Sequence, residues 1–121
     1  MKTRDQFRAE RASVHIASVK ADVVKEYAAE ARAFAPAVSQ GGLGVALASL
    51  KSKGSVAKSS LYDHLSGWVA ESVFAEPKAD LLALVIKSPS SKVVRAQEEA
   101  LLYAGWLKRF VEAREPKARK A

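Results

Sequence analysis

Residues 90–113 are S-S-K-V-V-R-A-Q-E-E-A-L-L-Y-A-G-W-L-K-R-F-V-E-A, and this stretch decides the fold class. Its apolar and small side chains recur every three or four positions: Val93, Ala96, Ala100, Tyr103, Ala104, Leu107, Phe110 and Val111. At 100° per residue these side chains share one broad face, which predicts a long helix packed on a core. The alternation that is typical of strands competes nowhere along the chain.

The N-terminal third predicts a second long helix. A capping box of Thr3 and Gln6 begins it, and apolar residues continue on one stripe as far as Phe34. Pro36 is expected to end or kink this helix. We therefore expect helical structure from residue 3 to about residue 34.

Three further helices are expected between these two. The pair Gly41-Gly42 breaks the chain, and a helix follows from Leu43 with Gly54 as its C-terminal cap. The other two helices span 55–74 and 80–86. Ser88 and Pro89 are expected at the N-cap and first position of the final helix. The prediction is an all-α, compact bundle of about five helices, a single domain over 1–113 with a mobile basic tail over 114–121.

The composition indicates a polyanion as the partner. Twenty Lys and Arg oppose thirteen Asp and Glu, which gives a net charge of +7. Such a balance favours nucleic acid first and an anionic membrane second, while a merely solvated basic surface is the alternative. The polar start of the chain and the short apolar run at 81–86 predict a cytoplasmic protein with no membrane partner.

Three groups of basic residues are candidate RNA contacts. One face of the first helix carries Arg4, Arg8, Arg11 and His15, beside the core stripe. The turn around Gly54 carries Lys51, Lys53 and Lys58. The outer face of the last helix carries Arg95, Lys108 and Arg109, beside Leu102 and Trp106. Such residues bind phosphates, but the alternative for each group is an ordinary solvated surface. Trp106 is either a binding hot spot or a residue that closes the edge of the core.

The sequence predicts no catalytic residues, no metal site and no cofactor or small-molecule substrate. There are no cysteines and only two histidines, His15 and His64, and phosphate-cradling glycine loops are missing. Arg8 and His15 are separated by six residues, a spacing similar to the R-x4–6-H motif of HEPN-type RNases. That motif normally occurs late in its domain, and the polar residue usual after the arginine is Ala9 here. A HEPN-like RNase stays open as an alternative.

Three segments, taken in order, resemble the small subunit of type III-B CRISPR (Cmr) complexes. Residues 42–54, G-L-G-V-A-L-A-S-L-K-S-K-G, resemble that family's G-L-G-x-A-L-A-[FS]-L-x-S-K-G. Residues 61–68, L-Y-D-H-L-S-G-W, resemble its L-Y-x-x-L-x-x-W, and residues 99–110, E-A-L-L-Y-A-G-W-L-K-R-F, its E-A-L-x-x-x-x-W-L-K-R-F. Gln97 departs from the family, which often has Thr there.

The resemblance implies a helical, non-catalytic subunit of an antiviral ribonucleoprotein. Copies are expected to stack along the backbone and large subunits, and to hold guide and target RNA through Lys and Arg. Head-to-tail stacking needs an apolar interface, for which Trp106 and Trp68 are candidates. The small subunit of type III-A complexes is also helical and basic, and composition does not exclude it. A helical adaptor that binds only protein is the remaining alternative.

Overall fold

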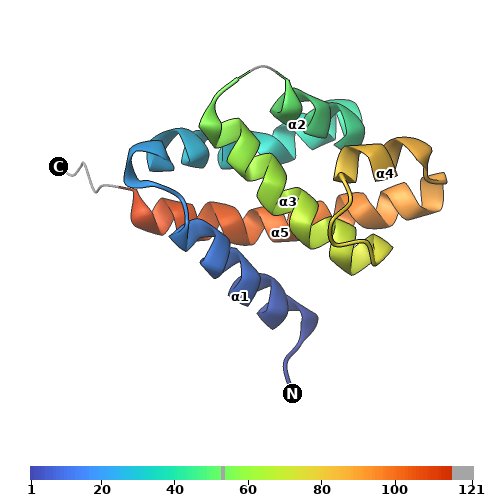
Figure 1. The fold of residues 1–121 in the computed structure, drawn as a ribbon, viewed down its shortest axis with the longest axis horizontal. Coiled ribbons are helices and arrows are strands. Elements are labelled where there is room, and N and C mark those ends of the chain that lie inside the picture. The colour runs from blue at the N-terminus through green and yellow to red at the C-terminus, as the bar shows by residue number, and fades with distance from the viewer. Residues whose placement is uncertain (53, 116–121) are drawn as a thin grey trace.

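The structure is a computed structural model that describes residues 1–52 and 54–115. Within these residues the elements, shown in Figure 1, are α1 (Arg4–Ala17), the 3-10 turn η1 (Ala21–Val23), α2 (Val24–Lys51), α3 (Val56–Phe74), α4 (Leu81–Lys87) and α5 (Ser90–Arg114). The prediction of an all-α bundle of about five helices is confirmed. The greater part of the predicted tail, residues 116–121, lies outside the described residues.

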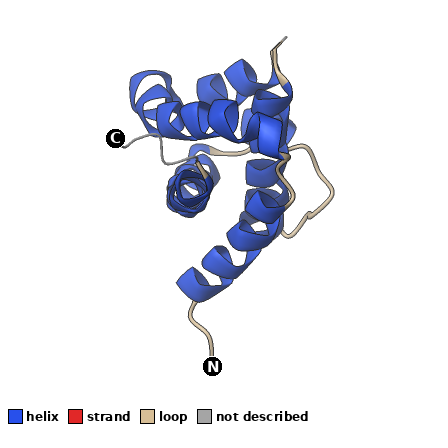
Figure 2. Cartoon of the chain, turned by 90° about the vertical axis from the view of Figure 1, so that its left-hand side faces the viewer, coloured by secondary structure: helices blue, strands red, loops and turns tan. Residues whose placement is uncertain are grey.

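The last helix organises the bundle. α5 packs against α1, α2 and α3, while α4 bridges α2, α3 and α5 near the start of α5 (Figure 1). The largest fully buried side chains are contributed by α2, α3, α4 and α5: Tyr27, Leu43, Leu47, Leu61, Leu65, Val69, Leu81, Tyr103, Leu107 and Val111. Figure 2 shows α1 leading away from the other helices toward the N-terminus. The start of α1 is therefore held by few neighbours, and its side chains must anchor it.

The prediction of one helix from Thr3 to Phe34 is wrong. α1 ends at Ala17, and the chain turns through η1 before α2 begins. Arg114 explains why the chain breaks without Gly or Pro, because its Nη1 donates to the carbonyl oxygens of Ile16 and Val19 at 2.6 and 2.7 Å. These carbonyls thus obtain partners from the far end of the chain. The apolar residues of both helices still fit one predicted stripe, because α1 and α2 pack on the same core.

The second helix continues where an end was expected. Pro36 lies inside α2, so the predicted stop before it is wrong. The predicted glycine break is confirmed as a kink, since Gly42 has φ 87° and ψ 169°. The amide of Leu43, freed by the kink, donates to Gln97 Oε1 at 3.3 Å. The helix ends with Ser52 as its C-cap, so the predicted Gly54 cap is also wrong.

The remaining boundaries follow side-chain caps. Ser55 accepts from the amide of Lys58 at the start of α3, and Asp80 accepts from the amide of Ala83 at the start of α4. Ser88 was expected to cap α5, but its hydroxyl donates to the Leu84 carbonyl at 2.6 Å and Pro89 occupies the N-cap. The final helix therefore begins one residue later than expected.

One helical stretch, Ala21–Lys51, is long and apolar enough by length and composition to cross a membrane. Its apolar residues include Tyr27, Phe34 and Leu47, which are buried against the other helices. A helix packed inside a bundle passes the same test of length and composition, and α2 is packed in this way.

Candidate nucleic-acid interface

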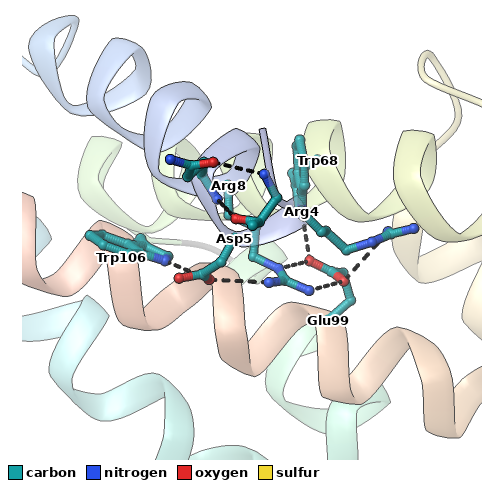
Figure 3. Close-up of polar contacts among 8 residues, drawn as sticks. Arg4, Asp5, Arg8, Trp68, Glu99 and Trp106 are labelled. Carbon is teal, nitrogen blue, oxygen red and sulfur yellow. Dashed lines mark hydrogen bonds and ion pairs between the residues drawn. The ribbon is translucent and has the colours of Figure 1, made fainter. Parts of the chain in front are cut away.

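The start of α1 is anchored to α5 by a buried ion pair between Arg8 and Glu99 (Figure 3). The two side chains meet through two hydrogen bonds, of which Nη2 to Oε1 measures 3.0 Å. Arg8 is 8% exposed and Glu99 is 6% exposed. Burial alone raises the pKa of Glu99, but the hydrogen bonds from Arg8 and Trp68 outweigh it and hold the pKa below its usual value.

This pair corrects the predicted arginine row. Arg8 was expected on an exposed face with Arg4 and Arg11, where it could reach phosphate. The structure buries its guanidinium, which donates three hydrogen bonds to Glu99 and Asp5. A buried guanidinium that is held by two carboxylates is not available to RNA without breaking the contact between α1 and α5. The expected exposed position of Arg8 is therefore wrong.

Trp68 is part of the same cluster. Its indole Nε1 donates to Glu99 Oε2 at 2.7 Å, and its ring stacks on Tyr103 with centroids 5.2 Å apart. The Arg11 guanidinium lies over the indole, 5.3 Å from its centroid. Trp68 is only 7% exposed, so little of it is available to a neighbouring subunit, and its role at an interface stays a prediction.

Trp106 closes the seam between α1 and α5. Its Nε1 donates to Asp5 Oδ1 at 2.9 Å (Figure 3), and its ring stacks on Phe110. The hydrogen bond from Trp106 is the main reason that the pKa of Asp5 is lowered. The side chain is half-buried against the core. This position matches the core-edge alternative, and a role between subunits stays a prediction.

The outer face of α5 carries cations without acidic partners. Arg95, Lys108 and Arg109 are exposed, as is the neighbouring Leu102. No carboxylate in the described part of the chain lies within ion-pairing distance of these three side chains. Seven-residue spacing places Arg95, Leu102 and Arg109 in one row along the helix. Arg95 and Arg109 therefore lie on the same side of α5, about 21 Å apart along its axis, and Lys108 lies outside this row.

The other predicted contacts are less free. Arg4 is exposed, 3.9 Å from Glu99, and Arg11 pairs with Glu71 at 3.1 Å. Lys51 pairs with Asp80 at 3.1 Å and lies over the Tyr62 ring.

Within the turn, Lys58 is half-buried, with no ion pair to any described residue. Lys53 lies outside the described residues. The three-lysine clamp predicted around Gly54 is therefore described only in part, with Lys51 already held by an acid.

The residues of the RNase alternative are also engaged elsewhere. The Nδ1 of His15 hydrogen-bonds the Tyr103 hydroxyl at 2.7 Å, and its ring stacks on His64. Arg8 is held by Glu99, so both members of the spaced pair have partners within the bundle. In the stretches 1–52 and 54–115, no three potential ligands gather into a metal-binding group.

Sequence reasoning missed Glu99. Its position alone could have revealed it, because an acid three residues after Ala96 and four before Tyr103 lies on the core face of the helix. A carboxylate placed there requires a buried cation. The chain has many candidates, and only the tertiary structure selects Arg8.

Comparison with known families gives the identity. The model of the family "CRISPR-associated protein (Cas_Cmr5)" matches residues 4–114. The chain belongs to the Cmr5 family. A crystal structure of a CRISPR-associated Cmr5 family protein from Thermus thermophilus superposes with a TM-score of 0.77 at 27% identity, over 93% of this chain and 97% of that one. A search of the curated proteins finds no match.

Cmr5 membership confirms the resemblance drawn from the three segments. The protein is a small subunit of a type III-B CRISPR (Cmr) complex and associates with the other subunits of that complex. As a Cmr5 protein it is expected to be soluble, and the apolar α2 is accordingly a core helix.

Proposed function

We propose that this Cmr5 chain holds guide and target RNA within the Cmr complex and does so without catalysing a reaction. The observation that carries the proposal is the group of exposed cations on α5, Arg95, Lys108 and Arg109, none of which forms an ion pair with a described acid. Because base pairing reads the sequence, the protein needs to supply only positive charge and shape. Contacts to phosphate meet that need.

The other predicted cations, of which Arg11 and Lys58 are half-buried, add weaker contacts to this surface. Arg4 and Arg11 lie on α1, and Lys51 and Lys58 flank the turn before α3, with Lys53 between them in sequence. Lys51 and Arg11 must exchange a carboxylate for a phosphate before they contribute. We therefore expect each of them to add less than a free cation of α5.

The proposal also includes copies that stack on one another, in the cytoplasm, beside the backbone subunits. A chain of copies needs two different, complementary surfaces, since a two-fold contact stops at a dimer. Exposed Ile86, Val94 and Leu102 supply apolar area on α4 and α5, and Trp106 lies beside Leu102 on α5. Trp68, which is 7% exposed, is the second candidate for this interface.

The test is target binding by the reconstituted Cmr complex across a range of salt concentrations. The variant R95E/K108E/R109E should weaken binding, and the salt slope should flatten by roughly 0.7–0.9 for each phosphate that is no longer neutralised. The control K20E/K25E/K78E makes the same change in net charge with exposed lysines from other segments. Equal affinities and slopes for the two variants would refute the α5 surface.

A further inference from the structure

A groove between α1 and α3 lies outside the cationic row of α5. Two adjoining hollows, about 380 and 330 Å³ in volume, share Phe7, Arg11 and Trp68 as lining residues. Arg4 and Glu71 complete the first hollow, and Glu10 and Val14 complete the second. Volumes above roughly 300 Å³ are those of pockets that hold small organic groups.

The walls of the groove are planar and unsaturated. Phe7 is 48% exposed, and the Lys2 Nζ lies 5.5 Å from the centroid of its ring. The Arg11 guanidinium is fixed between the Trp68 ring, 5.3 Å away, and the Glu71 carboxylate at 3.1 Å. Aromatic rings and held guanidinium planes are the surfaces on which unstacked nucleobases pack.

The charges of the groove favour a base over a phosphate. Arg4 and Arg11 donate hydrogen bonds, while Glu71 and Glu10 accept them, and the two carboxylates would repel a phosphate. A nucleobase edge carries donors and acceptors side by side and can satisfy both kinds of group. Arg11 already pairs with Glu71, and Glu10 with Lys2, so a base that enters the groove must share hydrogen bonds with these groups.

We infer that the α1–α3 groove binds one unpaired nucleobase of the RNA, stacked on Phe7. This inference rests on the proposed contact with RNA and adds a second kind of contact to it. The base enters between α1 and α3, and the cations on α5 are left to neutralise the backbone. The subunit would then contact a base at the α1–α3 groove and phosphates at the cations of α5.

The test uses the reconstituted complex with guide RNA and a set of synthetic target RNAs, each with one abasic position. Phe7→Ala should lower affinity roughly 5- to 150-fold, the range expected for loss of one stacked base, with an unchanged salt slope. Phe7→Trp should keep the affinity, and Val45→Ala, which truncates an exposed apolar side chain on α2 away from the groove, should have no effect. At one abasic position, the missing base should lower the affinity of the wild type for the target. The same target should bind Phe7→Ala no more weakly than the intact target does.

Two outcomes overturn the inference. One is equal affinity for wild type and Phe7→Ala on every target. The other is a loss of co-purification with the remaining subunits in Phe7→Ala without RNA, which would make the groove a protein contact. Either can occur while R95E/K108E/R109E still flattens the salt slope, so failure of the groove and failure of the α5 surface are distinguishable.

Discussion

The imidazole rings of His15 and His64 lie stacked, with centroids 4.4 Å apart and planes within 8°. Each ring accepts or donates one hydrogen bond at Nδ1, His15 with Tyr103 and His64 with Tyr27, both at 2.7 Å. Four residues from α1, α2, α3 and α5 thereby form one connected cluster. Stacked imidazoles tolerate one charge poorly and two still less, so this cluster makes the fold sensitive to acid.

Acid should destabilise the protein through this pair. Burial, together with the neighbouring His15, lowers the pKa of His64 to about 4, and burial and Arg11 lower the pKa of His15. The unfolded chain, with a His pKa of about 6.5, takes up protons first. Stability is therefore complete above pH 6.5 and is lost as the pH falls toward 4, by about 2–3 kcal/mol for His64.

Urea unfolding between pH 7.5 and pH 4.5 checks this expectation. His64→Gln keeps a polar side chain near Tyr27 and removes the titration, so its stability should vary less with pH than that of the wild type. Tyr103→Phe removes a hydroxyl but no titrating imidazole, and should keep the wild-type slope. Identical slopes for His64→Gln and wild type would contradict the assignment.

Glu99→Gln should destabilise the fold strongly. The change leaves the buried Arg8 charge with Asp5 as its remaining acidic partner, and loss of one member of a buried pair costs about 3 kcal/mol or more. The double variant R8M/E99Q should be more stable than the sum of the two single changes predicts, because it leaves no buried charge. Chemical denaturation of all four proteins measures the coupling.

A surface pair provides the control for this cycle. Arg32 bonds Glu112 and Glu115 on the outside of the bundle. Arg32→Met should cost far less stability than Glu99→Gln, because solvent screens an exposed pair. A cost for Glu99→Gln no larger than that of Arg32→Met would show that the Arg8–Glu99 pair does not anchor α1.

Gly42→Ala should destabilise the kink in α2. With φ 87° and ψ 169°, Gly42 occupies a region that is essentially restricted to glycine, although an added Cβ would meet no atom within 4 Å. The cost is therefore backbone strain, about 1–3 kcal/mol.

Gly44→Ala is the matched control for the kink. Gly44 is helical, and its added Cβ would only touch Val85 at 4.0 Å. It should leave thermal stability unchanged or raise it slightly, since Ala favours a helix by up to about 1 kcal/mol. Equal melting temperatures for the two variants would show that the kink is not a glycine requirement.

Asp80→Ala should loosen α4. Its carboxylate caps the helix at the Ala83 amide, accepts from the Tyr62 hydroxyl and pairs with Lys51. Loss of the cap costs about 0.5–2 kcal/mol. Asp80→Asn keeps a capping oxygen and should retain most of the stability, and Lys51→Ala should cost at most about 1 kcal/mol. If Asp80→Asn were as unstable as Asp80→Ala, the negative charge of Asp80, and not its capping hydrogen bond, would be what stabilises α4.

Periodicity alone was enough for the class of fold and for most helix boundaries. Val93, Tyr103 and Leu107 belong to a broad apolar face at helical spacing. A face of this kind packs against other helices. Caps such as Thr3 and Ser55 are local, since their partners lie three residues away. Sequence patterns did not predict the break at residues 18–23, because the group that bonds the carbonyl oxygens there belongs to Arg114, far along the chain.

The sequence by itself determined a basic, all-helical Cmr5 subunit, because helical period, charge and family segments are properties of the chain. Only the tertiary structure decided which cations are free. Arg8 and Arg109 are both arginines on amphipathic helices, yet one is buried on Glu99 and the other is exposed. The difference depends on a carboxylate 91 residues away in sequence, and no local pattern encodes that distance.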